Sequence, residues 1–248
     1  GCNRDPRCQK AHLLGYRHAR LGRQLLINFK EHFINDYLVA MDGKRNIIER
    51  KVDGDTESFL ADMWKGKFDE TAFIFPNAPE IPISVMSFDD IQQNEDEAGI
   101  TRSQAYIHSL IAKEIEKGIP SERIVLGGFS QGGAMSLMSG VTAPTRLGGI
   151  FGLSCYLLLR GKLREMIPSE NPNKQTPIFM GHGDADPVVR YEWGQATSKV
   201  LQEWGWNVDF KTYKGLPHSA APQEINDLER YIKERVPDLG DKPLPSKA

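Results

Sequence analysis

The chain has 248 residues, of which 40% are hydrophobic and 26% are charged. This length suits one domain with a sizeable core, and the composition is ordinary for a soluble globular protein. The formal net charge of −2 gives no reason to expect nucleic acid or an acidic membrane surface as a partner. No run of 18 or more apolar residues occurs, so we expect no stable insertion into a bilayer.

Residues 1–70 form a divergent N-terminal segment of the same domain, and its sequence pattern is the least regular. Residues 1–30 are rich in Arg and Lys, with Asp5 as their single acid. This composition is typical of a basic arm, which we favour, or of a transit peptide. Residues 47–50 are a candidate strand, and residues 58–64 are a candidate short helix.

The three cysteines are Cys2, Cys8 and Cys155. An odd count without framework spacing argues against a disulfide-stapled secreted domain. We therefore expect a cytoplasmic protein, with the nucleus as a further location. Cys155 lies in an apolar run and is predicted to be a buried free thiol.

From residue 71 to residue 236 the chain alternates strand-like and helix-like segments. Strands are predicted from short apolar runs, and helices from apolar residues at helical spacing. In chain order these elements are strand 71–75, helix 102–117, strand 124–128, helix 134–140, strand 149–154, strand 177–180, helix 191–204, edge strand 208–213 and helix 225–236. Such alternation implies an α/β fold, a mostly parallel central sheet with helices on both faces. The tail 237–248 is expected to be loose.

A serine motif lies between a predicted buried strand and a predicted helix. Gly128-Phe129-Ser130-Gln131-Gly132 matches G-x-S-x-G in the context that a nucleophile elbow requires. There the serine lies on a strained turn, and the two glycines remove side chains that would collide. We predict Ser130 as the nucleophile and the backbone N–H of Gln131, at a helix N-terminus, as an oxyanion donor. The alternative is a glycine-rich turn with a chance serine.

A serine hydroxyl needs a base to take its proton, and the chain offers six histidines. In the fold that this motif indicates, the chain order is Ser, then Asp or Glu, then His, which leaves His182 and His218. His182 directly ends the 177–180 strand and precedes the nearby aspartates, which inverts the order. His218 lies in a glycine–proline loop after the 208–213 strand, where a reachable base is expected. The order favours His218.

The acid is expected in the loop after the 177–180 strand, which holds Asp184 and Asp186. Pro187 stiffens the backbone next to Asp186. We predict that Asp186 holds the imidazole tautomer and stabilises the imidazolium. Asp184 is expected to cap or shape the turn.

The chain resembles the acyl-protein thioesterase and small carboxylesterase family of α/β-hydrolases. The segments that carry the likeness are 75–79, 95–100, 118–134, 153–160, 182–189, 210–215 and 218–219. The resemblance implies an α/β-hydrolase core over 71–236 with Ser130, Asp186 and His218 as the triad. It also implies hydrolysis, without a cofactor or a metal, of acyl thioesters on S-acylated proteins, or of small acyl esters. Leu157 and Leu158 are candidates for lining an acyl groove, with core packing as the equal alternative.

Two segments depart from that family's pattern. Family members carry a His-Gly-Leu-Gly-Asp-type loop after an early strand, which gives the second oxyanion donor, whereas here only residues 12–15 (HLLG) are similar. A Met- and Trp-containing stretch is shortened to residues 86–91. These departures predict slower turnover than in relatives. They leave a second function open, a weakly active or inactive pseudo-hydrolase that binds acyl chains or a protein partner.

Overall fold

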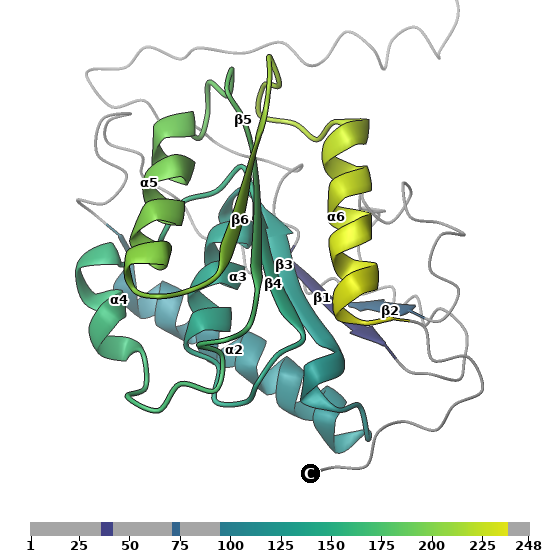
Figure 1. Cartoon of the computed structure of the whole chain (residues 1–248). Helices are drawn as coiled ribbons and strands as arrows, with labels where there is room; N and C mark the ends of the chain where they lie inside the picture. Colours follow the sequence, from purple (N-terminus) through teal and green to yellow (C-terminus); the bar gives the residue numbers. More distant parts are fainter. Residues whose placement is uncertain (1–35, 42–70, 75–94, 238–248) are drawn as a thin grey trace, which may run out of the picture.

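The computed structural model describes residues 36–41, 71–74 and 95–237, and within them one six-stranded sheet forms the centre (Figure 1). The strands are β1 (Asp36–Met41), β2 (Thr71–Ile74), β3 (Ile124–Phe129), β4 (Gly149–Leu153), β5 (Ile178–Gly183) and β6 (Val208–Tyr213). Their order across the sheet is β2-β1-β3-β4-β5-β6. Strands β3 to β6 run parallel, whereas β1 is antiparallel to both of its neighbours. The mostly parallel α/β fold is confirmed.

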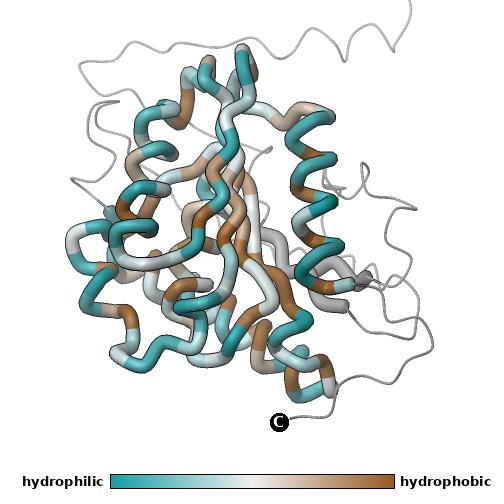
Figure 2. The backbone as a smooth tube through the Cα atoms, viewed as in Figure 1, coloured by the Kyte–Doolittle hydropathy of each residue, from teal (hydrophilic) through white to brown (hydrophobic). Residues whose placement is uncertain are grey.

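The three inner parallel strands are buried along their whole length. Every residue of β3, β4 and β5 is buried, and their sequences IVLGGF, GIFGL and IFMGHG are nearly continuous apolar runs. Such runs are expected where helices cover both faces of a parallel sheet. Strand β6 mixes buried and exposed residues and closes the sheet, so the predicted edge strand is confirmed. Figure 2 shows the hydrophobic residues gathered in the central strands.

Helices pack on both faces of this sheet. They are α2 (Glu97–Glu116), the 3-10 turn η1 (Ser121–Arg123), α3 (Gln131–Val141), α4 (Arg160–Met166), α5 (Tyr191–Glu203) and α6 (Pro222–Arg235). One hydrophobic cluster joins the sheet to residues of α2, α3, α4 and α5, and a second joins the other face to α6 (Figure 1). Among the described residues no helix is both long and apolar enough to cross a membrane.

Four helices differ from the sequence prediction, and one of them, α6, begins three residues before the predicted residue 225. Helix α2 begins before residue 102, because the Asp96 carboxylate accepts the backbone N–H of Gly99 at 3.0 Å and caps the helix upstream of its apolar stripe. Helix α3 begins directly after Ser130, ahead of the predicted 134–140. Helix α4 was not predicted, since its seven residues, RGKLREM, carry only one buried side chain, Leu163.

Two contacts join the ends of the described region to the rest of the fold. A strand of the first 70 residues, β1, does pair with β3, so that edge of β3 is occupied. The tail is anchored at its start, because Arg123 Nη2 donates to the carbonyl of Pro237 at 3.0 Å. Cys155 is a buried free thiol, as predicted. The candidate segments 1–30, 47–50 and 58–64, the tail 238–248, and the departures at 12–15 and 86–91 lie outside the described residues.

The register of the parallel strands brings their C-terminal ends to one edge of the sheet. Phe129 pairs with Leu153, Leu153 pairs with Gly181, and Gly183 pairs with Tyr213. In open α/β sheets, the crevice beyond these carboxyl ends is the usual place for a ligand. The loops that follow β3, β5 and β6 therefore meet at this edge, and they carry the three predicted catalytic residues.

Candidate active site

Ser130 occupies a strained turn between β3 and α3. Its backbone angles are φ 57° and ψ −123°, a positive-φ conformation that a residue with a Cβ rarely adopts. The Ser130 backbone N–H donates to the carbonyl of Leu153 at 2.8 Å, and the Ser130 carbonyl accepts from Ala134 at 3.0 Å. The elbow is thus tied to β4 on one side and to the first turn of α3 on the other.

Gly128 allows β3 and α3 to approach closely enough to make this turn. A Cβ placed on Gly128 would lie 2.5 Å from the backbone carbon of Gly132, a separation that real side chains do not reach. Helix α3 therefore starts at Gln131, directly below the serine, as the elbow interpretation requires. The N–H groups of the first helical turn have no partner inside the helix, and the helix dipole makes this end positive.

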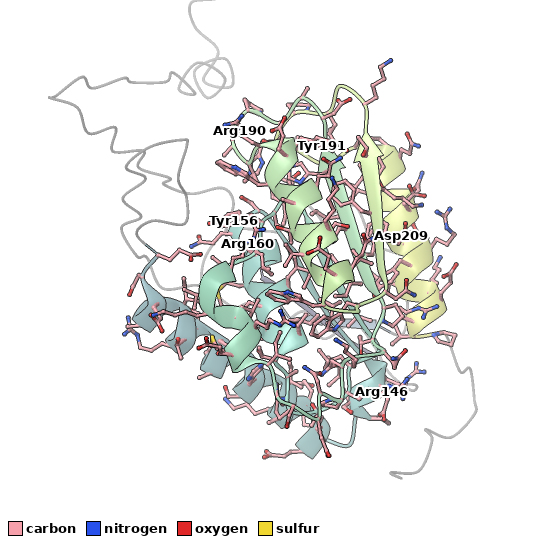
Figure 3. All side chains as sticks on the ribbon, turned by 60° about the vertical axis from the view of Figure 1, so that its left-hand side comes forward. Arg146, Tyr156, Arg160, Arg190, Tyr191 and Asp209 are labelled. Atoms are coloured by element: carbon pink, nitrogen blue, oxygen red, sulfur yellow. The ribbon has the colours of Figure 1, made fainter. Side chains whose placement is uncertain are left out.

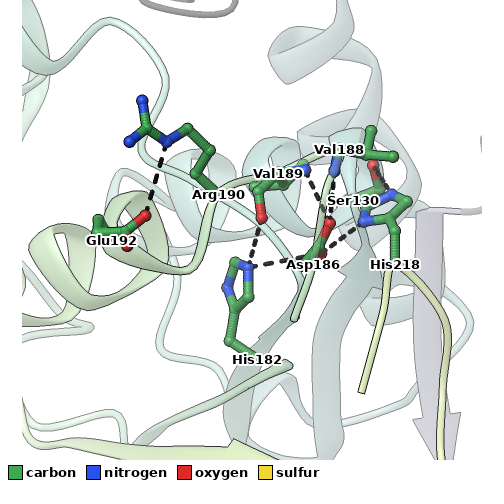
Figure 4. Close-up of polar contacts among 8 residues, drawn as sticks. All are labelled: Ser130, His182, Asp186, Val188, Val189, Arg190, Glu192 and His218. Carbon is green, nitrogen blue, oxygen red and sulfur yellow. Dashed lines mark hydrogen bonds and ion pairs between the residues drawn. The ribbon is translucent and has the colours of Figure 1, made fainter. Parts of the chain in front are cut away.

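His218 lies in the loop between β6 and α6 and faces the serine. Its Nε2 is 3.0 Å from Ser130 Oγ, a hydrogen-bonding distance, and its side chain is only 8% exposed (Figure 4). The ring also packs at 4.8 Å, centroid to centroid, on Phe129, the residue before the serine. This contact holds the imidazole over the elbow.

Asp186 holds the other nitrogen of the His218 ring. Asp186 Oδ2 accepts from His218 Nδ1 at 2.7 Å, and Asp186 Oδ1 accepts the backbone N–H groups of Val188 and Val189, each at 2.9 Å (Figure 4). Burial raises the pKa of the Asp186 carboxyl, but the bonds from His218 and from the two valine N–H groups outweigh it and lower the pKa below its usual range. The carboxylate is therefore ionised at neutral pH.

The structure separates the two aspartates of this loop. Asp184 is exposed, and its carboxylate accepts the backbone N–H of Gly215 at 2.5 Å, which ties the loop after β5 to the loop that leads to His218. Asp186 is the one brought to His218. The chain thus assembles Ser130, His218 and Asp186 and leaves Asp184 in a turn-shaping position.

Of the other candidate residues, Gln131 adjoins the triad, whereas Leu157 and Leu158 lie in the hydrophobic core. Gln131 is the first residue of α3, next to the serine. Leu157 and Leu158 are 1% and 4% exposed and belong to the larger hydrophobic cluster, a placement that favours core packing; their role in substrate binding stays a prediction. Among the described residues no three His, Cys, Asp or Glu side chains come together as a metal site.

Several contacts at the site are not predicted by the sequence. The N–H groups of Val188 and Val189 belong to the backbone, so no residue type signals them. His182, rejected as the base, lies 3.6 Å from Asp186 Oδ2 and is fully buried. The ring of Phe129 beside His218 is also unforeseen, although its place inside the G-x-S-x-G motif makes the contact understandable.

Glu224 is a buried carboxyl near this site. It lies in the first turn of α6 and is 0% exposed. The pKa of Glu224 is raised from its ordinary 4.5 to about 8, chiefly by burial; the backbone N–H of Ala221 acts to lower it, and the negative charges of Asp186 and Asp227 act to raise it. The folded protein therefore keeps a proton on Glu224 at neutral pH, whereas the unfolded chain releases it.

We expect Glu224→Gln to remove a pH-dependent loss of stability. The unfolded chain releases this proton near pH 4.5 and the folded protein near pH 8, so the free energy of unfolding of the wild type falls across that window and levels off above it. The variant lacks this fall, which is on the order of a few kcal/mol. Urea unfolding at both ends of the window measures it.

A matched control for this experiment lies on the same helix. The side chain of Glu234 is 57% exposed, and Glu234→Gln is expected to follow the wild type at both pH values. Equal pH dependence in the wild type and Glu224→Gln would show that Glu224 is not a buried neutral acid.

Comparisons with known proteins agree with this geometry. Residues 53–236 match the model of the phospholipase/carboxylesterase family. The chain is 50% identical over 192 residues to acyl-protein thioesterase 1 of Neurospora crassa, covering 71% of this chain and 78% of the relative. It is 46% identical over 199 residues to acyl-protein thioesterase 1 of Emericella nidulans, covering 72% and 83%.

Among solved structures the chain is similar to Arabidopsis thaliana SOBER1, with 34% identity and a TM-score of 0.55 over 66% of this chain and 76% of that one. The family match covers most of the chain, and both thioesterase relatives exceed 40% identity. The resemblance noted from the sequence is therefore confirmed. The chain belongs to the phospholipase/carboxylesterase family of α/β-hydrolases and is by class a serine esterase or thioesterase.

Proposed function

We propose that this protein hydrolyses acyl thioesters on protein cysteines through Ser130, His218 and Asp186. The observation that carries the proposal is the continuous hydrogen-bonded chain from Ser130 Oγ to His218 Nε2 at 3.0 Å and from His218 Nδ1 to Asp186 Oδ2 at 2.7 Å. The names of the relatives in Neurospora crassa and Emericella nidulans favour a thioester on a protein as the substrate.

In the first step Ser130 Oγ attacks the carbonyl carbon of the acyl group. His218 Nε2 takes the hydroxyl proton as the C–O bond forms, and the ring becomes an imidazolium. The ionised Asp186 accepts from Nδ1–H, so it fixes the tautomer that leaves Nε2 free as a base and stabilises the positive ring. No proton needs to reach Asp186.

The negative charge on the carbonyl oxygen develops beside the N-terminus of α3. The backbone N–H of Gln131 is the first of this helix and lies next to the nucleophile, so it is available to the oxyanion. Because α3 is almost completely buried, its dipole acts in a medium of low polarity, where such stabilisation is stronger than in water.

The tetrahedral intermediate then collapses and the C–S bond breaks. His218 gives its proton to the leaving sulfur, which departs as a cysteine thiol and leaves Ser130 acylated. A water molecule attacks the acyl-serine with His218 again as the base, and the free acid and the Ser130 hydroxyl are restored. The reaction consumes one water for each thioester and needs no cofactor.

We expect kcat/KM to rise with acyl length from acetyl to palmitoyl thioesters. Each additional CH₂ that leaves water on binding contributes about 0.8 kcal/mol, which corresponds to about fourfold in kcat/KM. Release of thiol from a series of acylated cysteine peptides measures this, with Ser130→Ala as the blank. A flat profile would exclude an acyl-binding groove.

The same assay separates the hydrolase from the acyl-binding alternative. A hydrolase releases thiol continuously, over many turnovers for each protein molecule. Saturable binding of the palmitoyl peptide without thiol release would instead favour a pseudo-hydrolase. Oxygen esters of the same acyl groups, tested in parallel, distinguish a thioesterase from a general carboxylesterase.

A further inference from the structure

His182 is a buried histidine that the proposed reaction does not use. It lies near the end of β5 and is 0% exposed. Its Nε2 is 2.9 Å from the carbonyl oxygen of Val189. Because a carbonyl can only accept, Nε2 carries the hydrogen and Nδ1 does not. Burial is the main cause that lowers the pKa of His182, so the ring is neutral at neutral pH.

The contact between His182 and Val189 restrains the loop that carries Asp186. The backbone of Val189 is held at both ends, since its carbonyl accepts from His182 and its N–H donates to Asp186 Oδ1 at 2.9 Å (Figure 4). His182 Nε2 lies 3.6 Å from Asp186 Oδ2, beyond hydrogen-bonding distance. His182 therefore donates its N–H to the carbonyl of Val189. Asp186 Oδ2 stays available to accept from His218 Nδ1.

Helix α5 keeps the His182 ring in this position. A Cβ on Gly194 would lie 2.2 Å from His182 Nδ1, so the first turn of α5 packs directly against the ring. Tyr191, at the start of the same helix (Figure 3), meets the ring edge-on with centroids 5.9 Å apart. Nδ1 has no hydrogen-bond partner among the described residues, so packing alone restrains that side of the imidazole.

We propose that His182 is a positioning residue for the acid of the triad. By fixing the carbonyl of Val189, its Nε2–H sets the loop between β5 and α5 so that Asp186 points to His218. The inference rests on the proposed function of Asp186. The charged and titratable groups that act on the ring are Asp186, His218 and Glu192, the last from α5.

Two substitutions at His182 test whether the donor itself matters. His182→Leu removes the N–H, and His182→Gln keeps an amide N–H near the position of Nε2. With the donor lost, Asp186 moves off His218, and a displacement on the order of 1 Å costs about 10²-fold in rate. We expect kcat/KM to fall about 10²-fold in the leucine variant and to recover largely in the glutamine variant.

The split between kcat and KM distinguishes positioning from a general loss of structure. Asp186 orients His218 and stabilises the imidazolium that forms in the transition state, so misalignment of Asp186 lowers kcat and leaves KM nearly unchanged. We expect His182→Leu to lose kcat at nearly constant KM, and His182→Gln to keep both values close to those of the wild type. Equal losses in both variants, or losses that fall on KM, would reduce His182 to a structural role and overturn the proposal.

A third variant acts on the ring from α5 and leaves the donor intact. Gly194→Ala pushes a methyl group into His182 Nδ1 and is expected to lower kcat as His182→Leu does. Gly161→Ala is the matched control, because Gly161 is an exposed helical glycine with no atom within 4 Å of an added Cβ. If Gly194→Ala behaves like Gly161→Ala, the ring is not held as proposed.

A measurement without substrate keeps this inference separate from the proposed function. The proton on His218 Nδ1, bonded to Asp186, gives a downfield proton resonance that His218→Ala identifies by its loss. We expect this resonance to be weakened or shifted in His182→Leu and retained in His182→Gln. An unchanged resonance in folded His182→Leu overturns the positioning role, whereas a wild type that hydrolyses no ester through Ser130 overturns the proposed function alone.

Discussion

Ser130→Ala is expected to abolish hydrolysis of both a p-nitrophenyl ester and a palmitoyl thioester. The Ser130 hydroxyl oxygen is the atom that bonds to the acyl carbon, and no neighbouring group can replace it. Loss of a triad serine costs about 10⁶-fold in kcat in a well-studied serine hydrolase, with a small residual rate from the oxyanion donors and binding. Release of p-nitrophenol and of thiol by the purified variant measures the loss.

His218→Ala provides the matched test that Ser130 acts with a base. The serine and the histidine work as one unit, so either single loss should cost nearly as much as the loss of both. The double variant is therefore expected to be no slower than Ser130→Ala. Losses that multiply in the double variant would mean that the two residues act independently, against the 3.0 Å contact between Ser130 Oγ and His218 Nε2.

Asp186→Asn is expected to lower kcat by about 10⁴-fold with little effect on KM. An amide in place of the carboxylate presents an N–H toward His218 Nδ1, which favours the wrong tautomer and gives no charge to stabilise the imidazolium. The bonds from Val188 and Val189 can persist to the remaining oxygen, so the loop is expected to stay in place. Steady-state kinetics on the p-nitrophenyl ester measure the change.

Asp184→Asn is the internal control, since both aspartates lie in the same loop. Its amide oxygen can still accept from Gly215, so we expect kcat to stay within a few-fold of the wild type. If Asp184→Asn shows the large loss and Asp186→Asn the small one, the roles assigned to the two aspartates are reversed.

The parallel part of the fold was predictable because β3, β4 and β5 are short apolar runs that end at glycine or serine, and β6 alternates as an edge strand does. The G-x-S-x-G motif could be interpreted for the same reason, because the sequence predicts a buried strand before it and a helix after it. Chain order then indicated His218, and Pro187 favoured Asp186. All of these signals are local, or depend only on the order of residues along the chain.

The features that escaped prediction depend on tertiary contacts. Strand β1 (DYLVAM) is too short and too mixed to stand out, and only its pairing with β2 and β3 defines it. Helix α4 begins after Leu159, a non-glycine residue at φ 48°, and no residue type marks that turn. The loop after β5 likewise brings the backbone N–H groups of Val188 and Val189, and the imidazole of His182, next to Asp186.

Covalent labelling with a fluorophosphonate probe, followed by intact mass and peptide mapping, tests the central claim most directly. The phosphorus atom is attacked by the activated serine alone and loses fluoride, so labelling requires the Ser130–His218 contact and no particular acyl chain. The wild type is expected to gain one probe mass at Ser130, and Ser130→Ala is expected to gain none. Failure of the folded wild type to label, or a label on any other residue, would contradict the assignment of Ser130 as the nucleophile.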